Sequence, residues 1–423
     1  MMTSKFVISL SACFLLAPFS LAVAQEETRD AYFDPQNLPA DIAWGNIDWL
    51  DADGQPTAAP DENTNVYLSG QRAAYYRHVV VPAGSDITVN SLTLANSGWG
   101  SNASKTLEIS GTADNLVKFS VKNAITFEGT AGQFNSIYAD YTNFSAGSIA
   151  ISYFGLVDFK NSTVDIGKIT TANVSTMAFS GTSGTVAGIS TGHSGNLNIQ
   201  NSSDITVTED FYSNANWNFN FSDSKATFAK TLSTATQANF TVTNSTVDIN
   251  TGLRSGGGAL VLNLENSSIV VRGVYGSSKN GIHAAGNGSF SLVNSTISTG
   301  ANDITINSDA STISISMMDA SQTLIECGNL NFTGILTVDF TGMDLARDTD
   351  FTLISAANAG TVFQALLDGG KVEVLGLKAG ESYSWNISDT SVVLSFAAIP
   401  EPAAYAALFG ALALAFAAYR RRV

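Results

Sequence analysis

Charge and cysteine are both scarce in this chain. Charged residues make up only 13% of its 423 residues, and the formal net charge is −16. Soluble domains usually carry about twice that share of charged residues. An acidic surface of this kind repels nucleic acid, so we exclude nucleic acid as a partner.

Of the two cysteines, Cys13 lies in an N-terminal apolar segment. We therefore expect Cys327 to remain alone as a small buried thiol, with no intramolecular disulfide.

The N-terminus has the pattern of an export signal. Lys5 supplies a positive charge, residues 6–16 are mostly apolar, and Ala22-Val23-Ala24 has the small-x-small form of a cleavage site. We predict a signal peptide over residues 1–24 and a secreted mature chain that begins at Gln25.

The C-terminal segment, residues 399–423, carries a second membrane-directed pattern. The uncharged run 403–419 would form a helix about 25 Å long, near the lower limit for a hydrocarbon core of about 30 Å. Because the run has no polar face, we predict a transmembrane helix rather than a buried core helix. Terminal arginines favour the cytoplasmic side, and they are rare at the end of a eukaryotic lipid-anchor signal, which is the rival interpretation. The flanking residues are the triplet Pro400, Glu401 and Pro402 and the basic cluster Arg420, Arg421 and Arg422.

This tail resembles the PEP-CTERM sorting tail of bacterial exported proteins, because it has the Pro-Glu-Pro triplet, the apolar helix and the arginine cluster in the same order. The resemblance covers residues 399–423 only. It implies that an exosortase-type membrane transpeptidase recognises and removes the tail. It also implies an inner-membrane intermediate and a final location at the cell surface or in the extracellular matrix.

The rest of the chain divides by composition. Residues 25–65 form a polar entry segment whose Trp44 and Trp49 could cap an apolar core. Residues 66–320 show short alternating apolar segments separated by Gly, Asn and Ser, which predict strands. Residues 321–398 keep the strand pattern, with a short helix near 362–367, and we interpret them as a C-terminal β cap.

A repeat runs through residues 66–320. Its turn residues occupy positions 161, 181, 201, 223, 244, 266 and 294, where five asparagines alternate with Gly181 and Asp223. A period near 21 suits three strands and three turns per coil, so we predict an all-β, right-handed parallel β-helix rather than an antiparallel sandwich. The N-terminal part diffusely resembles autotransporter-like β-helix passengers. We call the five asparagines at the repeated turn the turn asparagines: Asn161, Asn201, Asn244, Asn266 and Asn294. Weaker copies are expected at Asn96, Asn123, Asn143 and Asp319.

Stacked coils would place like residues on like. Residues two before each turn residue should form one internal apolar column, and residues three after it a second column. At the turn itself, Asn tolerates the left-handed conformation, and its amide can bond to the stacked neighbour. The first column would contain Phe159, Phe179, Ile199, Phe221, Val242, Leu264 and Leu292, and the second Val164, Val247, Ile269 and Ile297.

Candidate catalytic residues are few. Asp165 and Asp248 occupy equivalent positions four coils apart, which is about 19 Å and too far for a pair of glycosidase carboxylates. Asp204 and Asp223 lie about one coil apart at different offsets, so their facing stays open. The three histidines, His78, His193 and His283, have no partners at metal-ligand spacing. We predict no catalytic residue, no metal and no cofactor.

These patterns favour a non-enzymatic exported surface or matrix protein, structural or adhesive in the envelope or exopolysaccharide. Extracellular polysaccharide is then a partner. The alternative is a polysaccharide lyase or glycoside hydrolase on the same scaffold, which a groove of clustered acids beside an Arg or Lys would favour.

Overall fold

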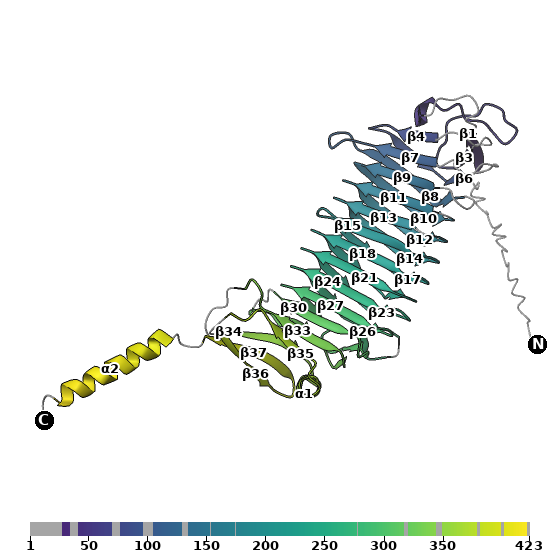
Figure 1. Cartoon of the computed structure of the whole chain (residues 1–423). Helices are drawn as coiled ribbons and strands as arrows, with labels where there is room; N and C mark the ends of the chain where they lie inside the picture. Colours follow the sequence, from purple (N-terminus) through teal and green to yellow (C-terminus); the bar gives the residue numbers. More distant parts are fainter. Residues whose placement is uncertain are drawn as a thin grey trace, which may run out of the picture.

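The computed structural model is a parallel β-solenoid of about 11 turns, with 59% strand and 7% helix. It describes residues 28–33, 41–69, 77–95, 105–128, 134–152, 154–173, 175–276, 278–316, 320–343, 349–378, 381–398 and 402–420. The coils stack into a rod with the chain's N-terminal part at one end and a small C-terminal cap at the other (Figure 1). The predicted all-β parallel solenoid is confirmed, and its right-handedness stays a prediction.

Two sheets wrap around the rod. The 14-stranded sheet contains β2 (Asp41–Ala43), β4 (Arg77–Val81), β7 (Lys105–Ser110), β9 (Phe134–Asp140), β11 (Phe154–Lys160), β13 (Ser175–Ser180), β15 (Gly195–Gln200), β18 (Trp217–Ser222), β21 (Ala238–Thr243), β24 (Leu260–Glu265), β27 (Gly288–Val293), β30 (Thr312–Ser316), β33 (Ile335–Asp339) and β35 (Val372–Leu375). The 23-stranded sheet contains β1 (Arg29–Phe33), β3 (Thr64–Ser69), β5 (Asp86–Val89), β6 (Ser91–Ala95), β8 (Val117–Phe127), β10 (Thr142–Ile151), β12 (Thr163–Thr171), β14 (Ser183–Thr191), β16 (Asp204–Val207), β17 (Phe211–Ser213), β19 (Lys225–Phe228), β20 (Leu232–Thr234), β22 (Thr246–Ile249), β23 (Leu253–Ser255), β25 (Ser268–Val271), β26 (Asn280–Ala284), β28 (Thr296–Ser298), β29 (Asp303–Ile306), β31 (Ile325–Glu326), β32 (Leu330–Phe332), β34 (Thr349–Ser355), β36 (Glu381–Ile387) and β37 (Ser391–Ala398).

Each middle coil has three strands, as the period predicts. One coil runs through β18, β19 and β20, and each strand pairs in parallel with its counterpart in the next coil. In the coils of β10, β12 and β14, the second and third strands are continuous through a bend. Gly167 lies at that bend, where a β-carbon would overlap the carbonyl oxygen of Gly147 in the preceding coil. Only glycine permits so close a stacking of the two backbones.

The pairing register reproduces the spacing of the repeat. Phe179 pairs with Ile199, and Ile199 pairs with Phe221, so each step equals the step between the turn residues of the same coils. The step lengthens between β24 and β27, where Leu264 pairs with Leu292, as it does between the last two turn asparagines. In the part of the chain that the structure describes, antiparallel strand ladders join only β34, β36 and β37. The antiparallel sandwich is therefore wrong.

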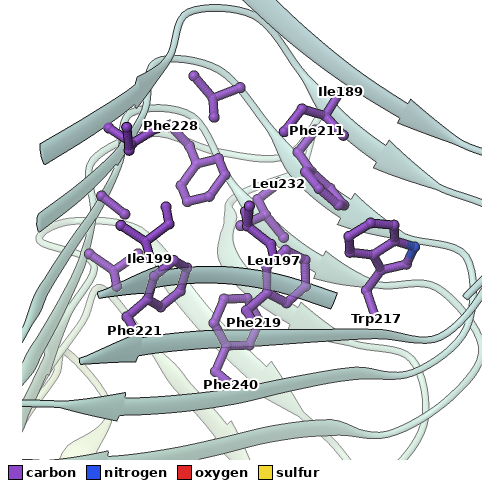
Figure 2. Packing of buried hydrophobic residues seen from close by; sticks show 14 of the residues in the cluster. Ile189, Leu197, Ile199, Phe211, Trp217, Phe219, Phe221, Phe228, Leu232 and Phe240 are labelled. Atoms are coloured by element: carbon purple, nitrogen blue, oxygen red, sulfur yellow. The ribbon is translucent and has the colours of Figure 1, made fainter. Parts of the chain in front are cut away.

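The two predicted apolar columns are confirmed. Phe159 stacks in register through Phe179, Ile199 and Phe221 towards Leu292, and every member is at most 2% exposed. Val164 continues in the same way towards Ile297. Aromatic side chains fill the middle coils (Figure 2), where the rings of Phe219 and Phe240 stack 4.5 Å apart. Such ring pairs add stability beyond the area that they bury.

Both ends of the rod are closed. At the N-terminal end, Trp44 and Trp49 are 6% and 4% exposed with ring centroids 5.1 Å apart, and Trp44 packs edge-on against Phe119. At the C-terminal end, the predicted short helix is α1 (Ala359–Asp368), which packs on β36 and β37. The parallel ladder continues past residue 320 as far as β35. The capping role expected of the two tryptophans is confirmed.

Candidate functional site

The predicted sorting tail is described only in part. Its helix is α2 (Pro402–Arg420), which projects beyond the cap (Figure 1). Large apolar side chains on it, such as Leu414 and Phe416, are 73% and 75% exposed. Pro400, Glu401, Arg421 and Arg422 lie outside the described residues.

No helix among the described residues is long and apolar enough to cross a membrane. The prediction of a transmembrane helix therefore needs correction. The helix itself forms where expected, over 19 residues. Those residues include the charge of Arg420, together with Gly410 and many alanines, which are less apolar than leucine or phenylalanine.

The turn asparagines do what their spacing predicts. All five have positive φ, between 45° and 56°, the region that Asn tolerates better than most residues. The side-chain amide of Asn294 donates to Asn266 over 2.9 Å, and Asn266 donates to Asn244 over 3.3 Å. Asn244 in turn donates to Asp223, and Asn161 donates to Asp140. The five are therefore structural, because they fix one corner of every coil that contains them.

A second ladder at the same corner was not predicted. The serine after each turn asparagine, Asn201 excepted, is at most 7% exposed. The backbone N–H of Ser245 donates to the hydroxyl of Ser267, and that of Ser267 donates to Ser295, each over 3.0 Å. These bonds satisfy backbone donors that the turn removes from the sheet. The repeated Asn-Ser pair in the sequence was the available signal.

Two of the weaker copies are wrong. Asn143 lies in β10, and Asn123 lies within β8 with its amide bonded to Asn90. The turn residue that precedes Asn161 is Tyr141, with φ of 48°. A bulky residue in this region is unusual, so no local preference could identify it. Asn96 and Asp319 lie outside the described residues.

The acids considered as a catalytic pair are not one. Asp165 and Asp248 share a column, separated by Thr185, Thr206 and Thr227 in successive coils, as predicted. The second pair of acids considered, Asp204 and Asp223, makes separate contacts. Asp204 forms an ion pair with Lys225, and Asp223 accepts a hydrogen bond from the side-chain amide of Asn244.

The histidines and the cysteine are also dispersed. Nε2 of His78 lies 2.6 Å from a carboxylate oxygen of Glu108, and the carbonyl of His193 accepts the indole N–H of Trp217. Burial, and then the charge of Arg254, lower the pKa of His283. Burial raises the pKa of Cys327 to about 12, which makes it the inert thiol expected. Within the described ranges, no three His, Cys, Asp or Glu side chains are placed to hold a metal.

The structure does gather one cluster of charged side chains, at the N-terminal end of the 14-stranded sheet. On its outer face, β7, β9 and β11 enclose a groove with a volume of about 320 Å³. We call it the acidic groove, and its outward side chains are Glu108, Ser110, Tyr138, Asp140, Asp158 and Lys160.

The register orders these side chains in two columns. Glu108, Tyr138 and Asp158 stack in one column, and Ser110, Asp140 and Lys160 stack beside it. Successive members lie about 4.8 Å apart, so Glu108 and Asp158 are about 10 Å apart along the rod.

Contacts hold each carboxylate of the groove. Ser110 donates to Glu108 over 2.6 Å, and the ammonium group of Lys160 lies 3.2 Å from Asp158. Asp140 accepts the amide of Asn161 over 2.9 Å. Tyr138 is 37% exposed and lies between the two acids of its column. The groove therefore offers an aromatic surface flanked by positioned hydrogen-bonding groups.

Sequence reasoning missed this groove. The step from Tyr138 to Asp158 fits the period of the repeat, but the step from Glu108 to Tyr138 is much longer. Because that coil is longer than the repeat period, the spacing in the sequence does not show that Glu108 and Tyr138 are stacked. The groove also contains the lysine beside acids that was expected of an enzyme.

Beyond the groove, the same face becomes neutral. The outward residues of β13, β15, β18 and β21 carry no charge. Amides stack on it from coil to coil: Asn218 donates to Asn196 over 2.9 Å, and Asn239 donates to Asn218 over 2.8 Å. We call this surface the neutral face, and it comprises Thr176, Ala178, Ser180, Asn196, Asn198, Gln200, Asn218, Asn220, Ser222, Asn239, Thr241 and Thr243.

No protein-family model, curated protein or solved structure matches this chain.

Proposed function

We propose that this protein is a non-enzymatic, exported solenoid that binds extracellular polysaccharide and serves as a structural or adhesive element of the cell surface or matrix. The single observation that carries the proposal is the neutral face. The net charge of the chain is −16, yet four consecutive strands carry no charge on their outer face. These strands follow directly after the strands of the acidic groove in the same sheet.

The chemistry of the neutral face suits hydroxyl-rich ligands. Asn, Thr, Ser and Gln side chains donate and accept hydrogen bonds without attracting a counterion. The amide ladders hold the asparagines in fixed geometry, which lowers the entropy lost when a ligand binds. Equivalent groups recur about every 4.8 Å along the rod. A polymer with its own repeat could therefore contact several coils at once.

Sorting is part of the same proposal. The export signal at residues 1–24 and the tail at residues 399–423 would bring the chain to the inner membrane and then to the surface. We infer that an exosortase-type transpeptidase recognises Pro400, Glu401 and Pro402 and removes α2 with the basic end. The exposed apolar side chains of α2 support this, because such a surface has to be shielded or removed in a mature extracellular protein.

The experiment is a glycan array probed with the full chain, followed by affinity measurements for the best polysaccharide. Asn218→Lys places a long charged side chain in the middle of the neutral face and should weaken binding at least tenfold. Thr206→Lys is the matched control, because Thr206 points outward from β16 in the other sheet. Absence of binding to every glycan, or equal losses in the two variants, would contradict the proposal.

A second candidate function is glycan cleavage at the acidic groove. The backbone positions of Glu108 and Asp158 lie about 10 Å apart along the rod, slightly beyond the range of about 6.5–9.5 Å for an inverting pair of carboxylates, and Tyr138 lies between them. Lys160 beside them is the feature expected of the enzymatic alternative. Reducing-end release above that of a boiled sample, lost in Glu108→Gln and in Asp158→Asn, would establish this function instead.

A further inference from the structure

We infer that the acidic groove is a binding subsite for amine-bearing saccharides, that is, for sugar units with a free, protonated amino group. This inference rests on the proposed function and names the class of saccharide that one end of the sheet face prefers. Its basis is the combination of a concave surface, an exposed aromatic ring and an excess of carboxylates.

The groove is a hollow of about 320 Å³ on the outer face of the same sheet that carries the neutral face. Glu108, Tyr138 and Asp158 come from three successive coils, so a ligand in the groove lies along the rod and crosses several strands. At about 4.8 Å per coil the column is about 10 Å long, which suits an elongated ligand of about two sugar rings rather than a single ion. Consistently, the described residues contain no cluster placed for a metal.

The ring of Tyr138 points to a saccharide rather than to a simple cation. Aromatic side chains bury apolar surface and also attract cations over their faces. A sugar ring offers a C–H face for such contact together with hydroxyl groups around its rim. Ser110 and the carboxylates beside the ring supply partners for those hydroxyls.

The balance of charge selects the amine. Glu108, Asp140 and Asp158 contribute three carboxylates, against which stand Lys160 and, 2.6 Å from a Glu108 oxygen, Nε2 of His78. The ion pair of Lys160 is made with Asp158, at 3.2 Å. The excess of negative charge attracts a protonated amino group and repels the carboxylate of a uronic acid. The same argument makes Lys160 a competitor of the ligand for Asp158.

The test uses the full chain and four probes in calorimetric titration: a glucosamine hexamer, the N-acetylglucosamine hexamer, a galacturonate hexamer and a hexalysine peptide. We expect the glucosamine hexamer to bind at least tenfold more tightly than its N-acetylated counterpart and the galacturonate hexamer not to bind. Affinity should fall as salt is raised, because exposed charges are screened. Hexalysine binding as tightly as glucosamine, or a preference for galacturonate, would overturn the inference.

Variants of the groove make the test specific. Tyr138→Ala and Asp158→Asn should each weaken glucosamine binding at least tenfold. Lys160→Gln should strengthen it, which no anion-binding site would do. Tyr212→Ala is the matched control, because Tyr212 is a similarly exposed tyrosine, at 45%, on β17 of the other sheet. Circular dichroism checks that each variant is folded.

Failure of this inference can be told apart from failure of the proposed function. If neutral polysaccharide binds and the groove variants bind glucosamine as the wild type does, the subsite is refuted while the proposed function stands. If no saccharide binds, both are refuted.

Discussion

Asn266 offers the sharpest test of how the solenoid corner is held. Its φ is 49°. Its amide donates to Asn244 over 3.3 Å, and its oxygen accepts the amide of Asn294 over 2.9 Å. Two contributions to stability therefore coincide at one residue: tolerance of the left-handed backbone and two ladder hydrogen bonds.

Two substitutions separate these contributions. Asn266→Gly keeps the backbone conformation and removes both hydrogen bonds. At a net value of about 0.5–1.5 kcal/mol each, and less at an exposed site, we expect a loss of about 1 kcal/mol. Asn266→Ala removes the same bonds and adds about 1–2 kcal/mol for a β-carbon in the left-handed region. The greater freedom of glycine in the unfolded chain offsets part of that difference, so we expect alanine to cost about 0.5–1 kcal/mol more than glycine.

The assay is urea unfolding of the full chain followed by far-ultraviolet circular dichroism. Asn263→Ala is the control, because Asn263 lies in the extended strand β24 of the same coil and should cost at most about 0.5 kcal/mol. If the alanine and glycine variants at position 266 unfold at the same urea concentration, backbone strain does not explain the choice of asparagine. If glycine costs nothing, the amide ladder contributes no stability.

Three further predictions concern the core, the thiol and the tail. Leu264→Asp should cost several kcal/mol and Glu265→Lys at most about 0.5 kcal/mol, because only Leu264 lies in an internal column; equal losses of melting temperature would refute the register. Cys327, with its pKa raised to about 12, stays protonated below that pH, so the native chain should not react with a thiol reagent at pH 8 until urea unfolds it; rapid reaction of the folded chain would show that the thiol is accessible. Replacing the Pro400–Pro402 triplet with alanines should leave the tail uncut, whereas the wild-type chain from the host surface should have lost it; an intact mass that still includes Val423 in surface-exposed wild-type protein would disprove the proposed processing.

Much of the fold could be predicted because its rules are local. Asparagine at a left-handed corner and alternation of apolar and polar residues are properties of short segments. A parallel solenoid repeats them coil after coil. The gaps between turn residues therefore became the pairing offsets, and residues such as Phe159 and Val164 fell into the predicted columns.

The sequence by itself determined the period, the strand direction, the core columns and the corner asparagines, since each depends on near neighbours and on stacking of like on like. Only the tertiary structure decided where the period is broken. It placed Tyr141 at a corner that no preference predicts, and it fused two strands of a coil through the bend at Gly167. It also brought Glu108 beside Tyr138 across a coil that is longer than the repeat period. The length of a loop between two coils does not affect which strands stack, so a groove assembled across such a loop has no fixed spacing in the sequence.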